Sequence, residues 1–238
     1  MRSVPSSCRA LLLATAFAVP MSAQAQLTEN FDSFAALTGN GWVFQNNSSP
    51  IGVASWFQGN AAVFPAFNGA ATSYVAANFL STTAGAGDIS NWMLTPLQTL
   101  TNGSVFSFYT RGVSGGFGFA DRLELRMSTS GASTNVGSTT TSVGDFTTLL
   151  TTINPALAPF GYPSDWTQFT ATVSGVSVPT TGRFAFRYFV SDVSVNGDYI
   201  GIDAVNYNAT SVVPEPSSVV LMGIGILGLA AVRRRRMV

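Results

Sequence analysis

The chain has 238 residues, of which 9% are charged. Its formal charge is zero, because eleven arginines balance eleven acidic residues, and the sequence contains neither lysine nor histidine. Between residues 26 and 210, five arginines face ten acidic residues, so this part lacks the basic surface that nucleic acid requires. The absence of histidine excludes every nucleophile that is activated by a histidine base.

Residues 1–25 are typical of a secretory signal peptide. Arg2 and Arg9 provide the positive start, an apolar stretch follows over Ala10–Val19, and Ala23-Gln24-Ala25 has the small-x-small pattern of a cleavage site. We expect cleavage after Ala25; the alternative is a short buried helix. The single cysteine, Cys8, lies in this segment, so the mature protein is expected to contain no thiol and no disulfide.

Residues 26–210 show the period-two alternation of half-buried strands, and long helical periodicity is absent. The alternating stretches are 103–110, 120–127, 166–174, 183–190 and 199–207. In residues 183–190, for example, Phe184, Phe186, Tyr188 and Val190 fall on one face. Such strands between turn-rich segments predict an all-β domain, an antiparallel jelly-roll-like β-sandwich.

Three connections carry turn signals. The glycine-rich segment 112–118 is interpreted as a hairpin connection, because neither a following helix nor a P-loop lysine supports a phosphate site. The long segment 139–163 is rich in threonine and proline, and we expect a short helix over Asp145–Ile153. Asn196-Gly197, just before the last strand, is a strong hairpin signal.

Residues 211–238 form a three-part tail. The motif Val213, Pro214, Glu215, Pro216 precedes an apolar stretch over 217–232, and Arg233, Arg234, Arg235 and Arg236 follow it. As a helix, the apolar stretch reaches roughly 24 Å, short of a ~30 Å hydrocarbon core, but it spans if the bilayer thins. The arginines should act as a membrane stop signal that stays in the cytoplasm. The bulk of the chain would then lie on the opposite side of the inner membrane.

The tail closely resembles the PEP-CTERM sorting signal in its Val-Pro-Glu-Pro-Ser-Ser start, glycine-rich span and terminal arginines. The resemblance implies processing by an exosortase, a membrane protease-transpeptidase of bacteria that make extracellular polysaccharide. We therefore expect transient inner-membrane anchoring followed by release to the cell surface or medium. The alternative is an ordinary tail anchor that is retained.

Residues 28–208 resemble the choice-of-anchor J family. The matching pieces are Asn30-Phe31-Asp32, Gly41-Trp42, residues 89–96 (ISNWMLTP), residues 106–109 (FSFY) and residues 197–205 (GDYIGIDAV). The segment is also similar to cleaved-adhesin domains and to jelly-roll carbohydrate-binding modules. These resemblances imply a jelly roll with a binding or structural role.

The similar modules often hold a structural Ca²⁺ between an acidic residue near the first strand and an aspartate in the last strand. That implies a site from Asp32, with Glu29, and Asp203, since Ca²⁺ takes six to eight oxygen ligands. The alternative is that Asp32 caps a turn and that Asp203 accepts hydrogen bonds from loop backbone. No other cofactor is expected.

Aromatic rings and carboxylates complete the candidates. Trp56 and Trp166 are the better candidates for exposed, sugar-stacking rings, whereas Trp92 is expected in the core. Asp121 and Glu124 should lie on opposite faces of a strand, as should Asp198 and Asp203, so neither pair can act on one glycoside from its own strand. We predict an exported, non-catalytic protein that is adhesive or associated with polysaccharide; the alternatives are a secreted carbohydrate-active hydrolase and a purely structural matrix component.

Overall fold

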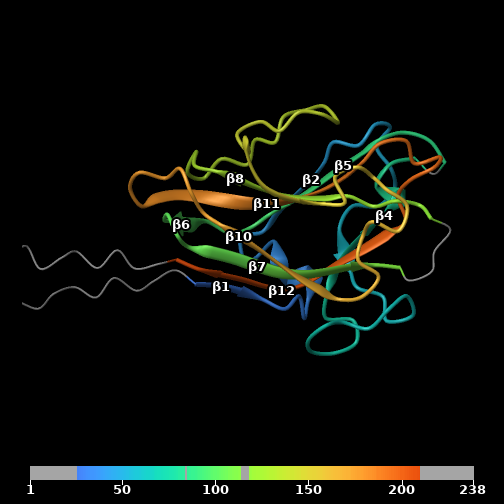
Figure 1. Cartoon of the computed structure of the whole chain (residues 1–238), viewed down its shortest axis with the longest axis horizontal. Helices are drawn as coiled ribbons and strands as arrows, with labels where there is room; N and C mark the ends of the chain where they lie inside the picture. Colours follow the sequence, from blue (N-terminus) through green and yellow to red (C-terminus); the bar gives the residue numbers. More distant parts are fainter. Residues whose placement is uncertain (1–25, 84, 114–117, 210–238) are drawn as a thin grey trace, which may run out of the picture.

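Two six-stranded antiparallel sheets pack face to face in this computed structural model, which describes residues 26–83, 85–113 and 118–209 (Figure 1). Within these residues the helices are one turn of α-helix, α1 (Phe34–Leu37), and one 3₁₀ turn, η1 (Phe79–Ser81). The predicted all-β antiparallel sandwich is therefore confirmed. The predicted signal peptide, the apolar span 217–232 and the arginine cluster lie outside the described residues.

Sheet A has the strand order β10-β7-β12-β4-β3, with β1 also paired to β12. Its strands are β1 (Gln26–Glu29), β3 (Phe57–Gln58), β4 (Val75–Asn78), β7 (Val105–Gly112), β10 (Thr167–Thr172) and β12 (Tyr199–Asn208). Sheet B has the order β2-β5-β11-β8-β9, with β6 also paired to β11. Its strands are β2 (Val43–Asn46), β5 (Ile89–Leu94), β6 (Gln98–Leu100), β8 (Leu123–Ser128), β9 (Thr148–Ile153) and β11 (Thr180–Val190).

The core lies between the two sheets and follows the alternation in the sequence. Phe184 and Phe186 of β11 are fully buried and meet Phe106 and Phe108 of β7 from the opposite sheet. The ring centroids are 4.5 Å apart for Phe106 and Phe184, and 4.9 Å apart for Phe108 and Phe186. Aromatic pairs at these separations add to the burial of apolar area, which is the main stabilising contribution in a domain without disulfides.

Three expectations about connections are wrong. Residues 148–153 form β9, not a helix, because this segment is rich in β-branched threonine and isoleucine and pairs with Leu123–Met127 of β8. The hairpins predicted at 112–118 and at Asn196-Gly197 do not form. The strands on either side of each connection, β7 and β8 in the first case and β11 and β12 in the second, belong to different sheets. Gly197 does adopt the positive φ of +81° that its turn needs, but the turn carries the chain from one sheet to the other.

The chain enters and leaves the sandwich at one edge of sheet A. Gln26, which begins β1, pairs with Asn208 at the end of β12. The two ends of the described domain are therefore neighbours, as is common for independently folding domains. No helix in residues 26–83, 85–113 and 118–209 has the length and apolar character that crossing a membrane requires.

Candidate functional site

Asp203 lies at the centre of sheet A under the loop that joins β3 to β4. Its side chain is fully buried, and Oδ2 accepts hydrogen bonds of 2.9 Å from the backbone N–H groups of Phe67 and Asn68. Oδ1 accepts a third bond from the Ala204 N–H. Burial raises the pKa of Asp203 to about 6, although these three bonds oppose the shift. Asp203 thus fixes the tip of this loop against the sheet.

Of the three predicted calcium ligands, Asp32 lies near Asp203, whose pKa its charge also raises. Glu29 accepts a hydrogen bond from the Phe31 N–H, and Asp32 Oδ1 lies beside Gly69 of the same loop. No group of three or more acidic, cysteine or histidine side chains suited to a metal is found among the described residues. Calcium binding stays a prediction, which a change of melting temperature on adding Ca²⁺ or a chelator tests.

The two tryptophans proposed as sugar-stacking rings differ in accessibility. Trp56 is only 3% exposed and belongs to the main core, so the expectation of an exposed ring is wrong there. Trp166 is half-buried; its Nε1 donates to the Pro65 carbonyl, and its ring packs edge-on against Phe64 and Tyr74. Trp92 is fully buried as expected, although it lies on the outer side of sheet B beneath the loop that contains Val136 and Phe146.

An aromatic cluster anchors the base of the β3–β4 loop to sheet A. Phe64 stacks on Tyr74 and meets the edge of Tyr199, and the Tyr74 and Tyr199 hydroxyls lie 3.0 Å apart. The guanidinium of Arg111 lies 4.4 Å from the centre of the Phe64 ring. Burial and the neighbouring Tyr199 hydroxyl raise the pKa of Tyr74 well above its usual range, so both phenols stay neutral hydrogen-bonding groups.

A second, exposed aromatic pair lies at the tip of the same loop. The ring of Phe67 stacks on Tyr109 of β7, with centroids 3.7 Å apart and ring planes 15° apart. Phe67 is 45% exposed, so the outer face of its ring is open to solvent. Sequence reasoning missed this pair, because residue alternation shows which way Tyr109 points but not which loop lies over it.

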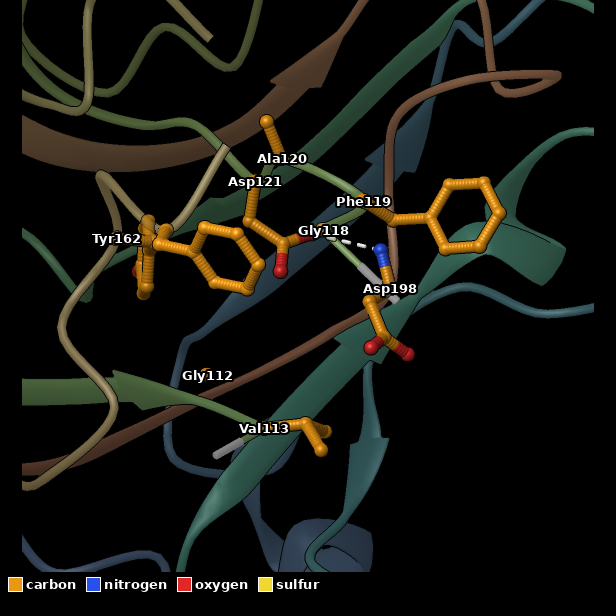
Figure 2. Close-up of a pocket in the computed structure, with 9 residues that line it drawn as sticks. Gly112, Val113, Gly118, Phe119, Ala120, Asp121, Tyr162 and Asp198 are labelled. Carbon is orange, nitrogen blue, oxygen red and sulfur yellow. Dashed lines mark hydrogen bonds between the residues drawn. The ribbon is translucent and has the colours of Figure 1, made fainter. Parts of the chain in front are cut away.

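Asp121 and Asp198 meet at one end of the sandwich, although they are far apart in sequence. Asp121 Oδ1 accepts hydrogen bonds from the Tyr188 hydroxyl at 2.6 Å and from the Asp198 N–H at 2.8 Å. Figure 2 shows that Asp198 turns its backbone nitrogen, and not its carboxylate, toward Asp121. Burial raises the pKa of Asp121 to about 7 and also raises that of Asp198.

The pocket beside these carboxylates is too small for a sugar. Its volume is about 30 Å³, which is close to the volume of one water molecule in the liquid. Gly112, Tyr162 and Phe160 help to line it. The carboxylates of Asp121 and Asp198 therefore do not flank a space in which a glycosidic bond fits, which disfavours hydrolysis at this pair.

A larger cleft of about 430 Å³ lies on the outer side of sheet B. One wall is the segment 46–51 and the other is Ser138, Thr139 and Thr140. The side-chain amides of Gln45 and Asn47 both donate to the Gly137 carbonyl and hold the two walls together. The cleft has the size of a ligand site, but its lining residues include no aromatic ring.

Comparison with known proteins covers the tail and the sandwich separately. Residues 212–236 match the family described as the PEP-CTERM protein-sorting motif. The chain carries a PEP-CTERM sorting motif. This match confirms the resemblance of the tail to the sorting signal; the membrane span over 217–232 and the role of Arg233–Arg236 as a stop signal stay predictions. A search of curated proteins found no match for the chain.

The sandwich is similar in fold to cleaved adhesin domains of Lys-gingipain. The K1 domain from Porphyromonas gingivalis W83 has 20% identity and a TM-score of 0.51, with 79% of this chain and 99% of that chain covered. The K2 domain of Lys-gingipain has 18% identity and a TM-score of 0.52, with 78% and 100% covered. At such identities the likeness concerns the fold, and it agrees with the resemblance to cleaved-adhesin domains in the sequence.

Proposed function

We propose that this protein is exported, sorted through its PEP-CTERM tail by an exosortase, and displayed at the cell surface or released, where its β-sandwich associates with extracellular polysaccharide without catalysis. The observation that carries the proposal is the sorting motif at residues 212–236. A sorting tail of this kind serves a protein that works outside the cytoplasm.

The chemistry of the described residues supports a binding role. The sequence contains no histidine, and the pocket beside Asp121 and Asp198 has a volume of only about 30 Å³. The exposed groups on sheet A include hydroxyls, amides and an aromatic pair, which are groups that recognise uncharged sugars through hydrogen bonds and ring stacking. The sandwich itself is a rigid support for such groups.

Two tail variants separate anchoring from processing. Changing Pro214, Glu215 and Pro216 to alanine leaves the apolar span 217–232 intact, so insertion should continue while processing stops. Changing Arg233–Arg236 to serine removes the charges that hold the end in the cytoplasm, so retention in the membrane should weaken. The measurement is cell fractionation, with the mass of each product determined by mass spectrometry.

The expected wild-type product lies at the surface or in the medium and lacks residues 217–238, whereas the triple-alanine variant remains full-length in the inner membrane. The host must carry the matching exosortase, and a strain that lacks this enzyme is the control. Full-length wild-type protein in the inner membrane of the competent host would contradict the proposed sorting and leave a simple tail anchor.

A further inference from the structure

The outer face of sheet A presents uncharged polar side chains in register across four strands. The strands lie in the order β10-β7-β12-β1, and two rows run across them. The first row is Thr170, Ser107, Asn206 and Thr28, and the second is Thr172, Val105, Asn208 and Gln26. Neighbouring strands are about 4.8 Å apart, so each row spans roughly 14 Å.

These rows face solvent because the alternate residues face the core. Phe106, Phe108 and Tyr207 are buried between the sheets, whereas Thr170, Thr172 and Asn208 are exposed. Seven of the eight side chains in the two rows are hydroxyls or carboxamides, which both donate and accept hydrogen bonds. The side chains of the two rows therefore form a hydrogen-bonding surface in which no side chain is charged.

The stack of Phe67 on Tyr109 borders these rows. Gln168 of β10 and Asp203 of β12 pair with Tyr109, which lies two residues beyond Ser107 on β7. Asp203 holds the backbone of Phe67 and Asn68, so the Phe67 ring is fixed in place before any ligand arrives. A preordered ring loses little conformational entropy when it binds.

The distribution of charged side chains around this face favours a neutral ligand over an anionic one. Arg122, Arg126, Arg183 and Arg187 belong to or adjoin strands of sheet B. Arg111 is on sheet A, but it lies over Phe64 and donates to the Ser164 carbonyl. The carboxylates near Phe67, those of Asp32 and Asp203, would repel a polyanion.

We propose that this face binds a neutral polysaccharide chain, with one sugar ring on Phe67 and the hydroxyls of neighbouring sugars bonded to the rows on β10, β7, β12 and β1. The inference rests on the proposed association with polysaccharide and specifies its surface and ligand class. The apolar C–H face of a pyranose covers the open side of the Phe67 ring, and Gln168, Thr170 and Asn206 supply hydrogen bonds around it.

Affinity gel electrophoresis of the exported protein tests this surface. The gels contain hydroxyethyl cellulose, a galactomannan or a mixed-linkage β-glucan as neutral probes, and alginate as the anionic probe. We expect retardation by at least one neutral probe and none by alginate. Phe67→Ala should weaken that affinity at least tenfold, and Gln168→Ala with Thr170→Ala should weaken it several-fold. Phe79→Ala is the matched control, since Phe79 is 38% exposed on η1, outside this face.

The possible outcomes distinguish an error in the proposed binding surface from an error in the proposed association with polysaccharide. Wild-type protein that no polysaccharide retards contradicts the proposed association itself. If Phe67→Ala and the double variant are both retarded as strongly as wild type, the proposed binding surface is wrong, although the association with polysaccharide stands. Equal retardation of wild type by alginate would also contradict the proposed surface. In Ser138→Trp the new ring fills the cleft on sheet B. If this variant loses binding while Phe67→Ala binds normally, the ligand occupies that cleft instead. Melting temperatures near that of wild type ensure that the variants are folded.

Discussion

Arg187 shows how single charged residues are accommodated inside this domain. It is 1% exposed, and its guanidinium contacts Glu124 at 3.2 Å, the Ser90 hydroxyl at 3.0 Å and the Thr140 carbonyl. Its charge also lies 3.6 Å from the centre of the Phe189 ring. Burial lowers the pKa of Arg187 to about 10, while Glu124 opposes the shift, so the side chain stays charged. This residue therefore joins sheet B to the loop that covers it.

Replacing Arg187 with methionine should lower the free energy of unfolding by about 3 kcal/mol, because removing one partner of a buried ion pair leaves the other uncompensated. The loss is at the lower end of the range for such pairs, since Arg126 remains 2.7 Å from Glu124. Urea denaturation followed by fluorescence measures it. Asp165→Asn is the control: Asp165 lies 4.0 Å from Arg111 and its side chain is 91% exposed, so that variant should change stability little. Equal effects of the two variants would contradict the assigned role.

Asp121 should make the fold more stable in mild acid than at pH 8. Its folded pKa of about 7 lies above the ordinary value of 3.8, so between these values the folded protein binds more protons than the unfolded chain. Stability therefore falls as the pH rises from 4 to 7, by about 4 kcal/mol at one pKa unit per 1.4 kcal/mol. Asp203, with a pKa of about 6, acts in the same direction.

Asp121→Asn should flatten much of this pH dependence, because the amide oxygen still accepts the bonds from Tyr188 and Asp198 but no longer ionises. Melting temperatures at several values between pH 5 and 8 measure the effect. A wild-type melting temperature that rises over this range would mean that Asp121 ionises freely in the fold.

At the scale of elements, β11 organises sheet B, because it pairs with β5, β8 and β6. Gly182 is the last residue of β11 that pairs with β6, and the next residue, Arg183, is the first that pairs with β8. A Cβ atom at this position would lie 2.1 Å from the Ser128 carbonyl oxygen and 2.4 Å from Leu100. The close approach of the three strands thus requires a glycine.

Gly182→Ala should therefore destabilise the domain by about 2 kcal/mol or more, because backbone must move to admit the methyl group. Gly39→Ala is the matched control: its Cβ would lie 3.4 Å from the nearest atom, the Ala36 carbonyl oxygen, at ordinary contact distance. Chemical denaturation compares the two variants. If Gly182→Ala is as stable as Gly39→Ala, the three strands do not need their observed spacing.

Sequence periodicity predicts elements here better than it predicts their partners. The strands around Phe106, Leu125 and Phe186 follow from alternation, since successive side chains of a strand point to opposite faces of the sheet. Which sheet a strand joins depends on long-range packing, and therefore the hairpins that the sequence predicts between β7 and β8 and between β11 and β12 do not form. The same limit applies to the site: the contacts of Asp121 with Asp198, and of Phe67 with Tyr109, join segments that no local pattern relates.

At the scale of the whole molecule, the sandwich carries its own stabilisation. Its core includes fully buried aromatic residues from both sheets, and its two ends, Gln26 and Asn208, lie on neighbouring strands. The only cysteine of the chain is Cys8, so no disulfide can form between residues 26 and 209. We therefore expect folding to depend on burial and sheet pairing within this segment, without a contribution from the tail or from oxidation.

A fragment of residues 26–209 should accordingly fold alone as a monomer, with a far-UV circular dichroism spectrum dominated by strand. Its melting temperature should be the same with and without a thiol reductant, because there is no bond to reduce, and should match that of the exported protein within a few degrees. Sedimentation velocity measures the oligomeric state, and the processed protein from the host is the reference. An unfolded or self-associated fragment beside a folded, monomeric exported protein would show that residues beyond 209 complete the domain.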